Sequence, residues 1–151
     1  EMECTAADDG FLDNELEVYY SFKLQRKLPG EEVWTDLHEW YRSSSAAYNM
    51  VKGEKEYPDC RFDFDMPDLQ GAAFRISYWL SEDDTSSDDH IGDYITGEYA
   101  YPLWRESNGD CAYPGDWGTV GGEPATCSES LYNSGMGIIV RWAVSELPVQ
   151  P

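Results

Sequence analysis

The sequence has few basic residues for its length. Of its 151 residues, 10 are Lys or Arg and 30 are Asp or Glu, which gives a formal net charge of −20. Nucleic-acid binding needs clustered Lys and Arg side chains that contact phosphates, so this deficit excludes nucleic acid as a partner. A surface of this sign attracts cations and basic proteins, and we expect the partners to belong to these classes.

Long apolar runs and helical periodicity are also missing. No stretch approaches the about 20 apolar residues that a transmembrane helix needs, and no segment sustains the spacing of an amphipathic helix. The chain starts with Glu1 rather than Met and shows no signal peptide. We therefore expect a processed, mature protein that is secreted, and an excised segment of a longer protein is the alternative.

Motifs of common catalytic sites are absent from the sequence. His38 and Glu39 are not followed by a second His at the zinc-protease spacing, and no Gly-x-Ser-x-Gly motif occurs. With 30 acidic residues, a carboxylate pair of the glycosidase type stays open as an alternative. We expect the protein not to be an enzyme.

The four cysteines show neither zinc-ribbon nor redox spacing, because no Cys-x-x-Cys pair occurs among Cys4, Cys60, Cys111 and Cys127. Their even number in a chain expected to be secreted predicts two disulfides. A Cys111–Cys127 bridge would close a Gly/Pro-rich loop and leave Cys4 to bridge with Cys60, but three pairings are possible.

What the sequence does contain is the material of a folded β-protein. Hydrophobic residues make up 41% and aromatic residues 15% of the chain, which argues against disorder despite the charge. The length indicates one domain over 1–151, with an N-terminal arm at 1–14 and a loop-rich segment at 105–136.

Apolar and polar residues alternate in several segments, as expected for half-buried strands. The clearest predicted strands cover residues 16–24, 62–66, 74–80 and 137–144. Weaker candidates lie at 37–42, 46–51 and 93–99, and residues 36–41 could instead form a short helix. Short strands separated by turn signals predict an antiparallel β-sandwich with long loops.

An acidic run follows the predicted strand at 74–80. Residues 81–92 read Ser-Glu-Asp-Asp-Thr-Ser-Ser-Asp-Asp-His-Ile-Gly, and no Lys or Arg occurs between Ser81 and Trp104. Crowded oxygen ligands suit Ca²⁺. A solvated charge run is the plainer alternative, whereas an EF-hand is disfavoured because Asp88 stands at its glycine position and Tyr94 at its bidentate acid position.

Residues 57–97 resemble the middle of a C2 domain. Tyr57-Pro58-Asp59-Cys60-Arg61-Phe62 is similar to the segment that precedes a strand in that family, and Ser86-Ser87-Asp88-Asp89-His90-Ile91-Gly92 is similar to its Ser-x-x-Asp-x-Ile-Gly ending. The resemblance implies an eight-stranded antiparallel C2-like sandwich. It also implies that loops at one end of the sandwich bind Ca²⁺.

The resemblance also implies a set of calcium ligands. In the third loop they would be Asp83, Ser86 and Asp89, while Ser81 replaces an expected Asp and Asp84 could substitute for it. In the first loop Asp36 is the best candidate, with Glu31 or Glu32 as the nearest further donor. These departures predict a reduced site.

The usual partner of a C2 domain is a phospholipid membrane, and Trp104 and Trp117 are candidate anchors for a membrane or a ligand. The acidic surface favours a basic protein partner instead. The alternative function is an acidic structural or adhesive protein of an extracellular matrix that binds cations weakly.

Overall fold

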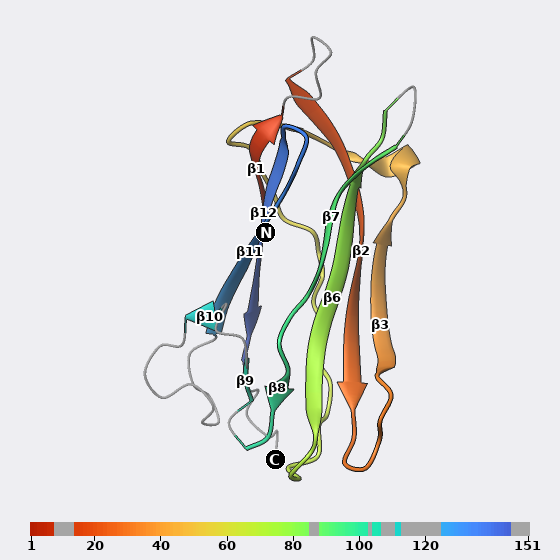
Figure 1. Cartoon of the computed structure of the whole chain (residues 1–151), viewed down its shortest axis with the longest axis vertical. Helices are drawn as coiled ribbons and strands as arrows, with labels where there is room; N and C mark the ends of the chain where they lie inside the picture. Colours follow the sequence, from red (N-terminus) through yellow and green to blue (C-terminus); the bar gives the residue numbers. More distant parts are fainter. Residues whose placement is uncertain (8–13, 85–87, 103, 107–110, 113–124, 146–151) are drawn as a thin grey trace.

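The computed structural model describes residues 1–7, 14–84, 88–102, 104–106, 111–112 and 125–145. These residues form two antiparallel sheets and no α-helix (Figure 1). The strands are β1 (Met2–Ala7), β2 (Glu15–Lys27), β3 (Thr35–Arg42), β4 (Tyr48–Val51), β5 (Lys55–Glu56), β6 (Ala73–Glu82), β7 (Asp89–Ile95), β8 (Tyr99–Ala100), β9 (Arg105–Glu106), β10 (Cys111–Ala112), β11 (Ala125–Asn133) and β12 (Met136–Val144). The all-β architecture is confirmed, and it is consistent with a β-sandwich. An eight-stranded C2 topology is not confirmed.

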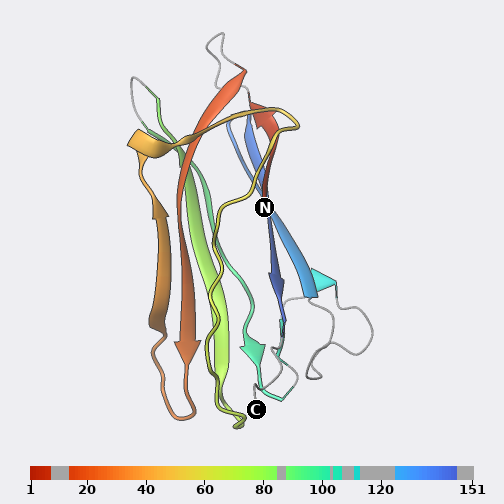
Figure 2. The same ribbon diagram turned by 180° about the vertical axis from the view of Figure 1, so that it is seen from behind.

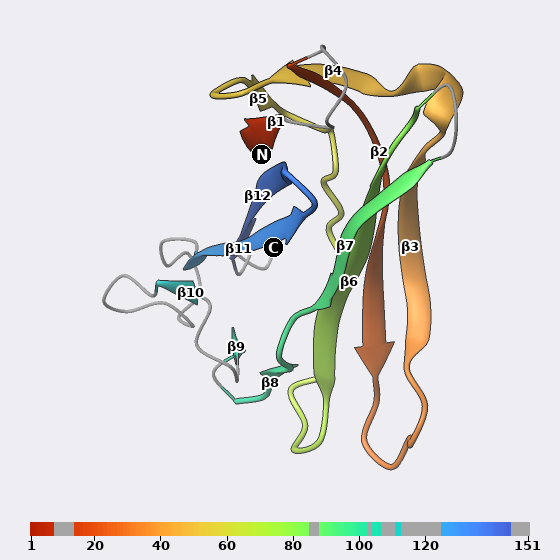
Figure 3. The same ribbon diagram turned by 45° about the horizontal axis from the view of Figure 1, so that its top comes forward.

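The two sheets lie face to face, as Figure 3 shows most directly. One is five-stranded with the order β10-β11-β12-β1-β5. The other is seven-stranded with the path β3-β2-β6-β8-β9, to which β4 and β7 add by pairing with β2 and β6. Of the arm expected at residues 1–14, Met2–Ala7 form the strand β1 of the five-stranded sheet, and residues 8–13 lie outside the described part of the chain.

The long strand β2 organises the seven-stranded sheet. Its alternating residues Leu16, Val18, Tyr20, Phe22 and Leu24 are all buried, as period-two patterning predicts for a strand with one face on the core. The strand pairs with β6 from Val18↔Glu82 to Lys27↔Ala73, and with β3 from Tyr20↔Arg42 to Arg26↔Thr35. The predicted strands at 37–42 and 74–80 are thus confirmed, and the helix alternative for 36–41 is wrong.

A tight hairpin joins β11 to β12. Ser134 and Gly135 both have positive φ, at 48° and 93°, which is the backbone of a type I′ turn. The ladder runs from Asn133↔Met136 to Ala125↔Val144. The prediction of loops throughout 105–136 is therefore wrong for 125–133, because the polar residues Thr126, Ser128 and Ser130 on the outward face of β11 hide its strand character.

Residues 57–72, called here the crossing segment, connect the two sheets. They form no strand, so the strand predicted at 62–66 is wrong. The alternation of apolar and acidic residues on which that prediction rested is nevertheless present in the structure. Phe62 stacks on His38 with ring centroids 4.8 Å apart, and Phe64 packs edge-on against Phe74 at 5.2 Å. One side of an extended chain thus covers the seven-stranded sheet without pairing to it.

The interior divides into two clusters along the long axis of the molecule. The upper cluster lies toward the end of the molecule where β6 leads into β7, at the top of Figure 1. It contains the fully buried side chains of Leu16, Leu80, Met50 and Ile138. The lower cluster is built around Leu24, Phe74, Tyr99 and Trp104, with Trp40, Phe64, Met66 and Trp142 only partly buried. Within the described residues, no helix is long and apolar enough to cross a membrane.

Candidate functional site

The acidic run lies at the upper end of the sandwich, between β6 and β7. Tyr19 Oη donates a hydrogen bond to Asp88 Oδ2 at 2.8 Å. Partial desolvation, then repulsion from and hydrogen bonding to Asp88, and finally repulsion from Asp84, raise the pKa of Asp83. Asp83 and Asp88 therefore lie close together, and no Lys or Arg is among the causes of this shift.

The predicted calcium ligands do not come together in one place. Asp36 pairs with Gln25 of β2, whereas Asp89 pairs with Glu82, which pairs with Val18 of the same strand. At a rise of about 3.3 Å per residue, the stretch from Val18 to Gln25 is roughly 23 Å long. The first and third loops thus lie at opposite ends of the sheet, because β2 and β3 are joined by a hairpin at the lower end.

Asp36 is occupied by other partners. It accepts hydrogen bonds from Lys23 Nζ at 3.0 Å and from Gln25 Nε2 at 2.7 Å. The Gln25 hydrogen bond first, and then Lys23, lower the pKa of Asp36. Glu32 is exposed in the same lower loop. Ser86 lies outside the described residues, and among the residues that are described no three His, Cys, Asp or Glu side chains converge as a metal site.

The cysteines follow the predicted pairing only in part. Cys4 and Cys60 are free thiols, and burial raises the pKa of both, so the expected Cys4–Cys60 bridge is not formed. The register places Cys111 directly opposite Cys127, and Cys127 is disulfide-bonded. This supports the Cys111–Cys127 pairing, although the side chain of Cys111 lies outside the described part of the chain.

The structure describes only one of the two predicted aromatic anchors, Trp104 and Trp117. Trp104 is 7% exposed and packs on Phe74 and Tyr101, so the prediction that it is an exposed anchor is wrong. Its ring belongs to the lower cluster instead. Trp117 lies outside the described residues.

A large cavity opens in the lower half of the sandwich, and it was not expected from the sequence. It measures about 1480 Å³ and is called here the groove. One wall is formed by Phe74, Ile76 and Tyr78 of β6, and the other by Val140, Trp142 and Val144 of β12. Small-molecule sites usually measure about 300–1,000 Å³, so the groove is large enough for more than a compact ligand.

Along the described residues, β1 pairs with only the upper part of β12. In Figure 2 the N-terminus lies at mid-height, while β12 continues below it. The last pairing is between backbones of Glu1 and Arg141: Glu1 N donates to Arg141 O at 3.0 Å, and Arg141 N donates to Glu1 O at 2.8 Å. Below Arg141, no described strand lies beside β12 on this side.

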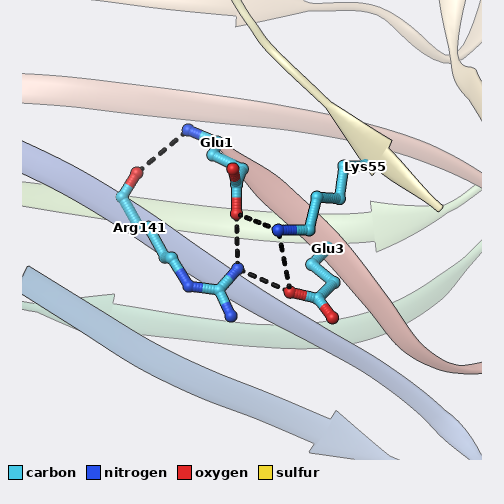
Figure 4. Close-up of polar contacts among 4 residues, drawn as sticks. All are labelled: Glu1, Glu3, Lys55 and Arg141. Carbon is cyan, nitrogen blue, oxygen red and sulfur yellow. Dashed lines mark hydrogen bonds and ion pairs between the residues drawn. The ribbon is translucent and has the colours of Figure 1, made fainter. Parts of the chain in front are cut away.

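Polar contacts hold this end of β1 in place (Figure 4). Arg141 Nη1 lies 2.6 Å from Glu1 Oε1 and 2.7 Å from Glu3 Oε2, and Lys55 Nζ lies 3.2 Å from Glu1 Oε1. These contacts link β12, β1 and β5 on the outer face of the sheet. They mark a defined upper boundary for the groove.

The rim of the groove is acidic. Among the described residues that line it, four are acidic, Glu1, Asp63, Asp65 and Asp68, and two are basic, Arg61 and Arg141. Arg61 pairs with Asp63 at 3.3 Å, and Arg141 with Glu1 and Glu3. Asp65 and Asp68 form no ion pair with another described residue, which leaves the crossing segment with uncompensated negative charge.

In comparisons with known proteins, no family model, curated protein or solved structure matches this chain. The resemblance to C2 domains stays a prediction. Sequence reasoning missed the groove, but one signal for it was present. The alternation of Phe62, Phe64 and Met66 with acids marked a segment with one apolar and one acidic side.

Proposed function

We propose that the protein is a binding module whose groove receives an apolar segment of a partner polypeptide. The observation that carries this proposal is the cavity of about 1480 Å³, walled by aromatic and aliphatic side chains of both sheets. Apolar surface of this extent is covered in most monomeric proteins. Burying it against a partner supplies the main driving force for association.

The acidic rim defines the kind of partner. Electrostatic complementarity speeds encounter and selects partners more than it adds affinity. With a net charge of −20 on the chain and unpaired Asp65 and Asp68 on the rim, a basic polypeptide is favoured. The proposed partner is thus a basic protein, the class that the net charge of the sequence already indicated.

Two matched tryptophan substitutions test this function. Trp142 lines the groove, whereas Trp79 lies on the same protein away from it, in contact with Tyr19 and Tyr41. The probes are the apolar dye Nile red and the capped peptide Lys-Val-Lys-Phe-Lys-Val-Lys, titrated by fluorescence and calorimetry. Trp142→Ala should abolish binding of both probes and Trp79→Ala should preserve it. Equal binding by the two variants, or none by the unmodified protein, would refute the proposal.

A second candidate function, calcium binding at the upper end, is supported by the closeness of Asp83 and Asp88. A cation would relieve the repulsion that raises the pKa of Asp83. Such a site would have to draw Asp83, Asp84, Asp88 and Asp89 together, since no three of these described residues converge in the structure, and it would leave out Asp36. Ion binding that orders a loop could then create a surface for a phospholipid membrane or a protein partner.

Calorimetric titration with Ca²⁺ separates this candidate from an acidic matrix protein. One saturable site that is lost in Asp83→Asn/Asp88→Asn and kept in Asp63→Asn/Asp65→Asn supports a calcium module. Weak, unsaturable binding that both double variants reduce alike supports bulk cation binding. Co-sedimentation with phosphatidylserine vesicles, with and without Ca²⁺, tests the membrane as the partner.

A further inference from the structure

The outer face of the seven-stranded sheet carries a group of aromatic side chains. Tyr19 follows the buried Val18 on β2 and therefore points away from the core. Ser21, two residues further along β2, points the same way, and its partners Tyr41 on β3 and Trp79 on β6 share this face. Figure 2 shows the crossing segment passing over the inner face of the sheet, and no described loop passes over the outer face in Figure 1. Tyr19, Tyr41 and Trp79 are called here the aromatic patch.

The three rings form one surface. Tyr41 and Trp79 flank Ser21 on β3 and β6, so their backbones are two strand spacings apart, roughly 10 Å. Their ring centroids are 6.2 Å apart, which means that the rings lean together over Ser21 and leave it 1% exposed. Tyr19 meets Trp79 edge to face at 5.6 Å. Tyr41 is nevertheless 62% exposed, so the patch offers aromatic surface to a ligand.

Carboxylates surround the aromatic patch. Asp88 accepts a hydrogen bond from Tyr19 Oη at 2.8 Å, and Glu39 accepts one from Ser21 Oγ at 2.6 Å. Asp93 of β7 lies beside the rings on the same face, and its side chain is 76% exposed. Charge complementarity therefore favours a cation as the ligand of the patch.

Another ring on this face already binds cations of the chain itself. The Arg75 guanidinium lies 4.3 Å and Lys27 Nζ 4.8 Å from the centroid of the Trp34 ring. Lys27 also pairs with Glu98 at 3.0 Å, so ring, cation and carboxylate occur together. The aromatic patch has the rings and the carboxylates, but no Lys or Arg in the described part of the chain lies over its rings.

Two basic side chains near the patch have other partners. Lys23 Nζ lies 3.0 Å from Asp36 and 4.0 Å from Glu39. His90 Nε2 lies 3.1 Å from Asp93, and it balances the charge of that carboxylate only when it is protonated. The cation that the rings lack must therefore come from another molecule.

We propose that the aromatic patch binds an arginine side chain of a basic polypeptide. A guanidinium stacks on aromatic rings and donates paired hydrogen bonds to a carboxylate, and the patch offers both partners. The ammonium of lysine is more strongly hydrated and lacks the planar fork, so arginine is preferred. The site goes beyond the proposed function, because it lies on the outer face of the sheet whereas the groove opens on the inner face.

Two peptides that differ only in their cations test this preference. Capped Gly-Arg-Gly-Arg-Gly and Gly-Lys-Gly-Lys-Gly have equal charge and no apolar side chain for the groove. The indole N–H signal of Trp79 in heteronuclear NMR spectra, assigned with Trp79→Phe, reports occupancy of the patch. It should shift saturably with the arginine peptide. Kd should be about two to five times higher for the lysine peptide, because stacking on exposed rings contributes this much.

Two exposed tyrosines supply matched variants that should both fold. Tyr41 belongs to the patch and is 62% exposed, whereas Tyr132 lies on β11 of the other sheet and is 69% exposed. Tyr41→Ala should raise Kd for the arginine peptide about twofold to fivefold. Tyr132→Ala should leave this Kd unchanged. Asp93→Asn removes one exposed carboxylate and should raise it about twofold.

The proposal is overturned by an unshifted Trp79 signal, by equal Kd for the two peptides, or by equal Kd in Tyr41→Ala and Tyr132→Ala. A shift with cellohexaose but not with the arginine peptide would assign the patch to a carbohydrate instead. A dimer in sedimentation velocity that Tyr41→Ala dissociates would assign it to a second copy of this chain. Either result would refute arginine binding.

These outcomes are distinct from those for the groove. The groove peptide Lys-Val-Lys-Phe-Lys-Val-Lys contains no arginine, so Trp79→Ala stays its control. Failure of the arginine peptide would leave the proposed function of the groove intact, and failure of the groove peptide would leave arginine binding at the patch intact.

Discussion

The two halves of the sandwich are built from the same sheets but are closed differently. In the upper half β1 fills the position between β12 and β5, and Met2 and Cys4 complete a core in which Leu80 and Ile138 have no exposed surface. In the lower half β12 continues without β1. There Trp40 and Trp142 are only partly buried and border the groove.

This difference shows what a single strand contributes to a sandwich. It supplies main-chain partners for its neighbour and side chains that exclude water from the space between the sheets. Where β1 is absent, the crossing segment covers only the seven-stranded sheet, through Phe62 and Phe64. Within the described residues, the lower half is therefore less completely closed than the upper half.

The largest expected contrast is in stability. Leu80→Ala should lower the free energy of unfolding by about 3 kcal/mol, because it opens a cavity in a fully packed core. Phe62→Ala should cost less than about 1.5 kcal/mol, because the ring is 39% exposed and borders open space. Urea unfolding followed by circular dichroism measures both. Similar losses for the two variants would contradict the contrast between the halves.

Substitutions that enlarge a side chain test the same contrast between the packed upper half and the lower half. Val18→Phe should destabilise the upper core by about 1–3 kcal/mol through overpacking. Ile76→Phe should change stability by less than about 0.5 kcal/mol, because Ile76 lines the groove and the added atoms enter it. The same variant should weaken peptide binding. Unchanged peptide affinity in a stable Ile76→Phe protein would show that the peptide binds elsewhere.

The smallest expected effects are changes in Tm for variants of Asp83 and Asp36, which lie at opposite ends of the sheet, and these changes should depend on pH. The folded state raises the pKa of Asp83, so ionised Asp83 opposes folding above its unfolded pKa. This penalty disappears as pH falls through the raised folded pKa. Asp83→Asn should therefore raise Tm at neutral pH, on the order of 1–2 °C, and the gain should vanish in acid.

Asp36 should behave in the opposite way. Gln25 and Lys23 lower its pKa in the folded state, so its ionised form stabilises folding above its unfolded pKa. That stability is lost as pH falls through the lowered folded pKa. Asp36→Asn should lower Tm at neutral pH and match the unmodified protein in acid. Thermal melts of both variants over a range of pH measure the change in Tm relative to the unmodified protein. A change of the same direction for both variants at neutral pH would contradict the opposite pKa shifts of Asp83 and Asp36.

The sequence predicted those parts of the fold that depend on local pattern. Alternation located the strands around Leu16–Leu24, Phe74–Leu80 and Gly137–Val144, because each places one face on the core. It failed at Phe62–Met66, because a strand needs a hydrogen-bonded neighbour as well as two unlike faces. The same limit explains β11, whose outward Thr126, Ser128 and Ser130 resemble loop sequence until β12 is seen beside it.

The site depended on pairings that no local pattern reveals. Asp36 and Asp89 were grouped by a family resemblance, but the β2–β3 hairpin places them at opposite ends of β2. The groove is lined by β6, β12 and the crossing segment, which only the tertiary structure brings together. Trp104 is likewise buried by Phe74, which is distant in the sequence, and by Tyr101, which lies in a segment without regular alternation. Neither contact could be predicted from a local pattern.

Titration of Trp142→Ala with the peptide Lys-Val-Lys-Phe-Lys-Val-Lys tests the central claim most directly, because Trp142 lines the groove and is only partly buried. The unmodified protein and Trp79→Ala should bind the peptide with a saturable calorimetric signal, and Trp142→Ala should lose that signal. Undiminished binding by Trp142→Ala, or no binding by the unmodified protein, would contradict a groove that receives an apolar segment of a partner.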